Sequence, residues 1–234
     1  MSNSEKEKPG LFIRVPKNAS TSILNCLRDN DLRIKHTSIE SLGKWKRRSY
    51  PPGTFPGVLY AKTGRCSRLI TLHSNFVNLE DVYSFGFVRN PYERVVSSYY
   101  LHSNDQLINY WASENPSTWH RPENFKDYLR FLLTQDLNPD AIFSSEQTLL
   151  AGAQYPFLID EERKIRADFI GKVENLQDDL SFVCEKIGVP NMKVPHVNKT
   201  NHKHYTEYYD KEAVDIVSTL YQRDIEIFDY KFGQ

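Results

Sequence analysis

Two short segments of this chain combine cations with hydroxyl groups in a way that suits the binding of phosphate-like anions. Residues 16–22 read Pro-Lys-Asn-Ala-Ser-Thr-Ser, and residues 89–97 read Arg-Asn-Pro-Tyr-Glu-Arg-Val-Val-Ser. Lysine and arginine supply positive charge, and serine and threonine supply hydrogen-bond donors without charge. Each segment follows an apolar run and is therefore predicted to lead from a strand into a helix. The pair predicts two anion sites that hold two ends of one nucleotide.

The first segment is predicted to join a buried strand at residues 11–15 to a helix that begins near Thr21. The run 11–15 is short, branched and mostly apolar, and apolar residues recur at helical spacing after Thr21. The first N–H groups of a helix and the positive end of its dipole attract anions. Lys17 adds a charge there, and Ser20 and Ser22 add donors. The alternative is an ordinary helix cap beside a solvated lysine.

The second segment is predicted to follow a strand at residues 83–88. Asn90 suits the N-cap of the next helix, Pro91 its first position, and Glu93 the closing position of a capping box. Arg89 then stands at the carboxyl end of the strand, and Ser97 lies two turns along the helix. A guanidinium at that point can bind a phosphate through two hydrogen bonds. The alternative is that Arg89 pairs with a nearby carboxylate while Ser97 faces solvent.

Together the two segments resemble the motifs of the PAPS-dependent sulfotransferases, specifically the carbohydrate-type family called sulfotransferase family 2. That family has a Pro-Lys-x-Ala-Gly-Thr-Ser loop around the 5'-phosphosulfate of 3'-phosphoadenosine 5'-phosphosulfate (PAPS), and an Arg-x-Pro-x-x-Arg-x-x-Ser stretch at its 3'-phosphate. Residues 171–176, 196–200 and 224–230 are also similar to the family, so the resemblance spans about residues 11 to 232. Ser20 stands where the family commonly has glycine. Because serine disfavours positive φ, either the loop is remodelled or Ser20 donates a hydrogen bond of its own.

The resemblance implies a three-layer, P-loop-like α/β fold with a mainly parallel central sheet flanked by helices. It also implies transfer of a sulfuryl group from PAPS, with release of 3'-phosphoadenosine 5'-phosphate (PAP). Arg89 and Ser97 are expected to bind the 3'-phosphate, and Lys199 to reach a phosphate from a polar lid. The residues expected at the 5'-phosphosulfate are Lys17, Asn18, Ala19, Ser20, Thr21 and Ser22.

The chemistry requires charge stabilisation on the leaving phosphate and a base for the acceptor proton. Lys17 is the candidate for the first task. His73 is the candidate base because it ends the apolar run 69–72, at a predicted strand end, and because residues 73–76 match the His-x-x-Phe setting of uronyl 2-O-type family members. A histidine there can also be merely structural. Glu114, His102 and His120 are the reserve candidates.

The acceptor side is predicted within residues 103–125, where aromatic and polar residues alternate without clear periodicity. A hydroxyl or amine of a carbohydrate or of a small polar metabolite is the expected acceptor. Plain packing of an insertion remains the alternative for this stretch. The residues expected to contact the acceptor are Trp111, Glu114, Trp119 and His120. The alternative function is a nucleotide- or polyanion-binding module without catalysis, and an ATP-using kinase is disfavoured because the Gly-x-x-x-x-Gly-Lys loop is missing.

Composition sets the outer limits of these predictions. The 234 residues suit a single domain at 10–234 after a disordered start at 1–9, with core helices near 125–132, 176–187 and 213–228. With 30 basic and 30 acidic residues the net charge is zero, which argues against bulk attraction to nucleic acid or membrane. The three cysteines cannot all pair, and Cys26 and Cys184 fall on predicted apolar helix faces. No membrane span, export signal or metal site is predicted, so a cytoplasmic location is expected, or else an excised Golgi-luminal domain.

Overall fold

The computed structural model describes residues 8, 10–30, 35–37, 58–61, 79–103, 121–137, 150–160, 162–194 and 203–234. The chain forms two compact units, which are described separately. Unit 1 consists of Met1–Val88 and Gln154–Lys199, and unit 2 consists of Arg89–Ala153 and Thr200–Gln234. Among the described residues, no helix has both the length and the apolar character that crossing a membrane requires.

Unit 1 contains a five-stranded sheet in the order β2-β3-β1-β4-β5. The strands are β1 (Gly10–Ile13), β2 (Lys35–Thr37), β3 (Val58–Ala61), β4 (Tyr83–Val88) and β5 (Phe169–Lys172). Every neighbouring pair is parallel. The predicted α/β class with a parallel sheet is therefore confirmed. The strand predicted at 83–88 has the expected bounds, whereas the one predicted at 11–15 ends earlier, at Ile13.

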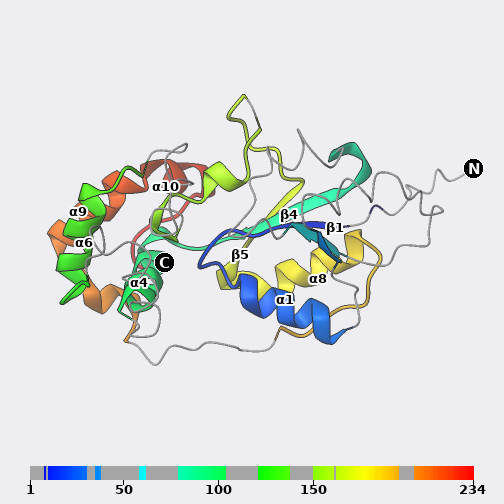
Figure 1. Ribbon diagram of the computed structural model, residues 1–234, viewed down its shortest axis with the longest axis horizontal. Helices are drawn as coiled ribbons and strands as arrows, with labels where there is room; N and C mark the ends of the chain where they lie inside the picture. The colour runs from blue at the N-terminus through cyan, green and yellow to red at the C-terminus, as the bar shows by residue number, and fades with distance from the viewer. Residues whose placement is uncertain are drawn as a thin grey trace, which may run out of the picture. The chain divides into compact units, whose positions relative to one another are not determined.

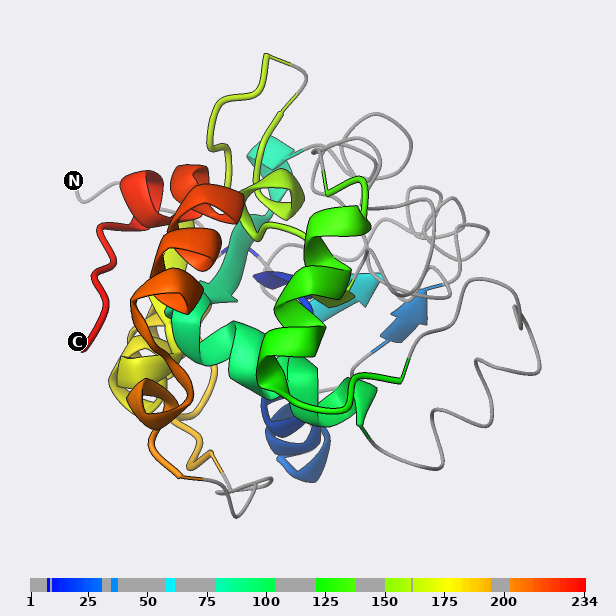
Figure 2. The ribbon, with the colours of Figure 1, turned by 90° about the vertical axis from the view of Figure 1, so that its left-hand side faces the viewer.

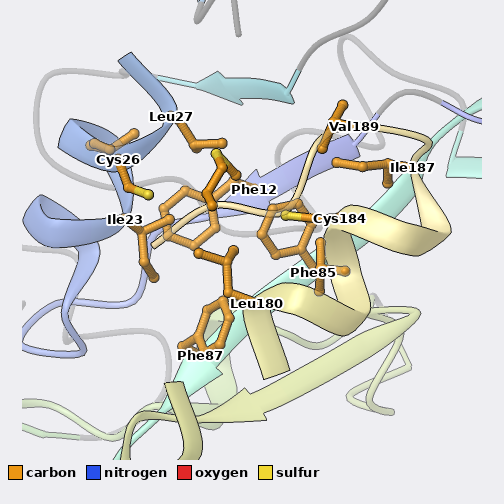
Figure 3. Close-up of a cluster of buried hydrophobic side chains, with 13 residues drawn as sticks. Phe12, Ile23, Cys26, Leu27, Phe85, Phe87, Leu180, Cys184, Ile187 and Val189 are labelled. Atoms are coloured by element: carbon orange, nitrogen blue, oxygen red, sulfur yellow. The ribbon is translucent and has the colours of Figure 1, made fainter. Parts of the chain in front are cut away.

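One face of this sheet is covered by helices α1 (Ser20–Asp29) and α8 (Leu176–Lys186) (Figure 1). Phe12 of β1 and Phe85 and Phe87 of β4 point toward these helices and form the centre of a buried cluster (Figure 3). Cys26 and Cys184 lie in the same cluster as free thiols, on helix faces as predicted. Burial raises the pKa of both thiols, so at neutral pH they act as small apolar side chains.

The other face of β4 is approached closely by Leu158, which follows the short helix η3 (Tyr155–Phe157). A Cβ atom placed on Gly86 would lie 2.8 Å from the Cδ2 atom of Leu158. Glycine at position 86 is therefore required for this approach. Near its start the same strand is tied to the segment before β5, because the Ser84 hydroxyl donates to the Asp168 carboxylate at 2.6 Å.

Unit 2 is helical, with α4 (Pro91–His102), α6 (Phe125–Thr134), η5 (Tyr205–Tyr208), α9 (Lys211–Leu220) and α10 (Gln222–Phe228). In Figure 2, α6 is the green helix and α9 the orange one. Helix α4 packs against α6, α9 and η5. Many of the contacts are between aromatic rings, for example Tyr99 with Phe125 at 5.7 Å between centroids. The helix predicted at 213–228 is two helices, because the chain leaves helical geometry at Tyr221 (φ −117°, ψ 23°).

Candidate functional site

The segment at residues 16–22, which we call the anion loop, joins the central strand β1 to helix α1. Its backbone alternates in handedness: Lys17 has φ 67° and Ala19 has φ 53°, whereas φ of Asn18 between them is not positive. Alternation of left-handed residues with a residue of negative φ is the pattern of anion-binding nests, in which successive N–H groups face one concave side. Left-handed geometry costs each of the two non-glycine residues about 1 to 2 kcal/mol, so the surrounding contacts must stabilise the loop.

Side-chain hydrogen bonds hold the anion loop from two directions. The Asn18 side chain is buried, and its Nδ2 donates to the Phe87 carbonyl oxygen at 2.8 Å and to Oε1 of Gln154 at 2.7 Å. The Ser20 hydroxyl donates to the Val15 carbonyl oxygen at 2.9 Å. Of the two possibilities raised by serine at position 20, the hydrogen bond is therefore the one observed. The left-handed residues are its neighbours, and Ser20 itself begins the helix.

The start of α1 completes the anion loop. The helix begins at Ser20, close to the predicted Thr21, and its first backbone bond runs from the Ile23 N–H to the Ala19 carbonyl oxygen at 3.0 Å. The N–H groups of this first turn belong to the set that has no acceptor within its own helix. Lys17 is half-buried, Thr21 is exposed and Ser22 is buried. Lysine, hydroxyl groups and the helix dipole thus meet at one short turn, as an anion site requires.

The second segment begins with Arg89, the residue that follows the last residue of β4. Its guanidinium lies 2.6 Å from the Glu93 carboxylate, one turn along the chain. Asn90 caps α4 as predicted, because its side chain accepts a hydrogen bond from the Tyr92 N–H at 3.1 Å. Glu93 pairs with Arg89, where a capping box had been expected. Ser97 is half-buried on α4. The carboxylate pairing foreseen as the alternative for Arg89 therefore exists, and it holds the guanidinium at the beginning of the helix.

The other arginine of this segment, Arg94, is inside unit 2. It is 1% exposed, and its guanidinium donates to the carbonyl oxygens of Gly152 at 2.7 Å and Leu150 at 3.4 Å. Burial lowers the pKa of the guanidinium, and the nearby Tyr221 and Asp224 oppose that shift. Even so, a guanidinium stays charged in proteins, so this is a buried cation that donates to backbone carbonyls and is stabilised by the charge of a buried carboxylate, Asp224. Arg94 organises the interior of its unit.

His102, one of the reserve candidates for the base, is fully buried in unit 2. Its Nδ1 lies 2.8 Å from the Ser98 carbonyl oxygen, and because a carbonyl can only accept, this nitrogen carries the proton. The Tyr128 hydroxyl lies nearby and donates to the Ser98 hydroxyl at 2.9 Å. Burial raises the pKa of that tyrosine. The molecule that accepts the sulfuryl group cannot reach a histidine that is fully buried, so the choice of His102 as a reserve base is wrong.

Several predicted site residues lie outside the described residues and remain predictions. They are the candidate base, the lid lysine and the four acceptor-side residues, namely His73, Lys199, Trp111, Glu114, Trp119 and His120. Among the residues that the structure does describe, no three histidine, cysteine or acidic side chains are grouped so as to hold a metal ion.

The strands that precede the two segments are neighbours in the sheet of unit 1. β1 and β4 are hydrogen-bonded neighbours and parallel, with Ile13 beside Gly86. Their carboxyl ends therefore lie at the same edge of the sheet, which is where open α/β sheets hold their ligands. The anion loop leaves the end of β1, and Arg89 is the residue after the end of β4.

Two residues with clear roles in these contacts were not predicted from sequence. Gln154 contacts Asn18 across 136 positions of sequence, and no local pattern indicates such a pair. The interior role of Arg94 did leave a signal: Arg94, Ser98 and His102 recur every four residues along α4 and are all buried. A polar stripe on a buried helix face indicates an internal hydrogen-bond network.

Comparison with known proteins identifies a family and structural neighbours. The model of the Sulfotransferase family matches residues 4–231. The crystal structure of a sulfotransferase from Alicyclobacillus acidocaldarius is similar to this chain with 14% sequence identity and a TM-score of 0.43, covering 96% of this chain and 97% of that one. No curated protein matches.

Proposed function

Since this chain belongs to the sulfotransferase family, we propose that it transfers a sulfuryl group from PAPS to a hydroxyl or amine and releases PAP. The observation that carries the proposal is the anion loop. It combines the alternating backbone of Lys17, Asn18 and Ala19 with a lysine and the beginning of a helix. These are three separate means of binding an oxyanion, and they coincide within seven residues.

At the 5' end of the donor, we assign the N–H groups of the anion loop and the hydroxyls of Thr21 and Ser22 to the phosphosulfate. The Ser20 hydroxyl already donates to the Val15 carbonyl oxygen, so Ser20 contributes its backbone N–H. Lys17 has the further task of following the negative charge that builds up on the 5'-phosphate as the bond to sulfur breaks. A fixed cation at a developing charge is an effective way to lower such a barrier, because the site needs no reorganisation during the reaction. The left-handed turn at Lys17 sets the direction in which its side chain leaves the loop.

At the 3' end, we assign the 3'-phosphate to Arg89 and Ser97. The parallel pairing of β1 with β4 supports this assignment, because it brings the ends of both strands to one edge of the sheet. The ion pair with Glu93 is compatible with it: a guanidinium has five N–H donors, and the carboxylate restrains the side chain before the ligand arrives. A bound phosphate then gains a charge-assisted contact at a reduced entropic cost.

The reaction supplied by PAPS is the in-line movement of an SO3 unit: the bond from sulfur to the 5'-phosphate oxygen breaks, and a bond to the acceptor oxygen or nitrogen forms. We assign to His73 the role of the base that takes the proton from the acceptor hydroxyl or amine. Lys199 is assigned to contact a phosphate of the donor. Trp111, Glu114, Trp119 and His120 are assigned to the acceptor. The acceptor class that we favour is a carbohydrate or a small polar metabolite, since a net charge of zero does not favour a long polyanion.

A thermal-shift comparison of PAP with ATP tests the choice of nucleotide. A ligand at 100 times its Kd stabilises the folded state by about 2.7 kcal/mol, so PAP should raise Tm by several degrees while ATP at equal concentration should have little effect. An equal or larger shift with ATP would contradict the proposal. The formation of PAP from PAPS, measured with a panel of sugar and amine acceptors, then distinguishes an enzyme from a binding module. A binding module would bind PAP but would form none from PAPS with any acceptor.

A further inference from the structure

The anion loop is held by a residue from a distant part of the sequence, and the contact is fully buried. The Asn18 side chain is 1% exposed and Gln154 is 0% exposed. One Nδ2 group makes both contacts, at 2.8 Å to the Phe87 carbonyl oxygen and at 2.7 Å to Oε1 of Gln154. An amide nitrogen has two hydrogens, so both are used.

The other polar atom of Asn18 does not anchor it. Its Oδ1 is buried and has no hydrogen-bond partner in the part of the chain that the structure describes. The two Nδ2 bonds are therefore what fix the Asn18 side chain. Phe87 contributes a carbonyl of β4, which the sheet keeps in place, whereas Gln154 contributes a buried side chain from the residue that precedes η3.

The position of Asn18 determines the backbone on both sides of it. Lys17 and Ala19 are the adjacent residues, and both are left-handed without being glycine. A chain that is free to relax would leave that region at such residues. Pinning the residue between them keeps the N–H groups of the loop aimed at one side and keeps the Lys17 side chain in its direction.

We propose that Gln154 is a positioning residue for the 5'-phosphosulfate site, acting through Asn18 on the backbone of the anion loop. The inference rests on the proposed function, because it takes the anion loop to bind the 5' end of the donor. An amide oxygen suits this task better than a carboxylate would. It accepts the hydrogen bond without placing a negative charge beside a site for an anion.

Calorimetry with two nucleotides tests the inference. Gln154→Met keeps the approximate volume of the side chain and removes the acceptor. We expect this variant to raise the Kd of PAP about tenfold, which corresponds to the loss of one buried hydrogen bond near a charged ligand. The Kd of adenosine 3'-phosphate, which has no group for the anion loop, should stay at the wild-type value. Gln222→Met is the control, because the Gln222 amide donates to Glu226 on an exposed surface of α10.

A second variant and a double variant keep the test decisive. Asn18→Ala removes the other partner of the same hydrogen bond. It should raise the Kd of PAP at least as much as Gln154→Met does. The double variant should bind PAP no more weakly than Asn18→Ala alone, because both changes act through one contact. Unchanged PAP binding in Asn18→Ala, or an equal loss for PAP and adenosine 3'-phosphate in Gln154→Met, would overturn the inference. If the wild type fails to bind PAP, the proposed function is contradicted, and the role of Gln154 that rests on it is contradicted as well.

Discussion

Replacing Lys17 with alanine should lower the rate of sulfuryl transfer by about a hundredfold to a thousandfold, while the protein remains folded. The Lys17 cation is assigned to the charge that appears on the leaving 5'-phosphate, so its effect should be larger in the transition state than on donor binding. Folding should be spared because alanine at position 17 meets the same left-handed backbone as lysine. The measurement is the initial rate of PAP release at saturating PAPS, with the acceptor that the wild type uses best.

The matched control for this variant is Lys164→Ala. Lys164 is exposed and pairs with Glu162 at 2.7 Å, so its loss removes a lysine of equal charge with no part in the anion loop. Its rate of PAP release should equal that of the wild type. A Lys17→Ala enzyme with wild-type turnover, at an unchanged Tm, would show that the leaving phosphate is stabilised by another residue.

Replacing Arg94 with leucine should lower the free energy of unfolding by about 3 to 5 kcal/mol. The substitution removes the Arg94 donor from the Gly152 carbonyl, and it leaves the Leu150 carbonyl with the Ser98 hydroxyl at 3.4 Å. It also leaves the buried Asp224 carboxylate without the cation beside it. A buried charge whose partner is removed costs far more than a lost surface pair. Urea unfolding, followed at equilibrium, measures the change.

Two further variants show whether the buried charge is the cause. Arg130→Leu, on the exposed side of α6, should change the free energy of unfolding by no more than about 0.5 kcal/mol. Asp224→Asn added to Arg94→Leu should recover part of the loss, since it removes the carboxylate charge that the Arg94 guanidinium had faced. If Arg94→Leu unfolds at the wild-type urea concentration, Arg94 does not organise the interior as we describe.

The parts of the fold that could be predicted are those with a local physical cause. The strand at residues 83–88 is an apolar run followed directly by Asn90 and Pro91, and both a cap and a proline restrict where a helix can begin. The break at Tyr221 was missed because the apolar spacing continues from α9 into α10 across it. There the Tyr221 hydroxyl donates to the Ala151 carbonyl oxygen, a contact between residues 70 positions apart that periodicity cannot indicate.

The candidate site divides in the same way. Lys17 and the hydroxyls after it could be found from sequence because a cation and a helix start adjoin one strand end. The left-handed backbone could not be predicted, because the two residues that adopt it are lysine and alanine and the loop has no glycine to indicate it. The role of Gln154 could not be predicted from local sequence, because its contact with Asn18 joins residues 136 positions apart. Arg94 belongs to the same motif as Arg89, yet burial gives the two guanidinium groups different tasks, and only the helical spacing of Arg94, Ser98 and His102 distinguishes them.

The measurement that tests the account most directly is a calorimetric comparison of three nucleotides, PAP, adenosine 5'-phosphate and adenosine 3'-phosphate, on the wild type, Lys17→Ala and Arg89→Ala. Arg89→Ala should raise the Kd of PAP about tenfold to a hundredfold, because a charge-assisted contact is lost, and it should leave the Kd of adenosine 5'-phosphate unchanged. Lys17→Ala should instead raise the Kd of PAP and of adenosine 5'-phosphate, the two ligands that carry a 5'-phosphate. It should leave the Kd of adenosine 3'-phosphate unchanged. Equal losses for all three nucleotides in both variants, or a wild type that binds PAP no better than adenosine 5'-phosphate, would contradict the assignment of the two segments to the two ends of one donor.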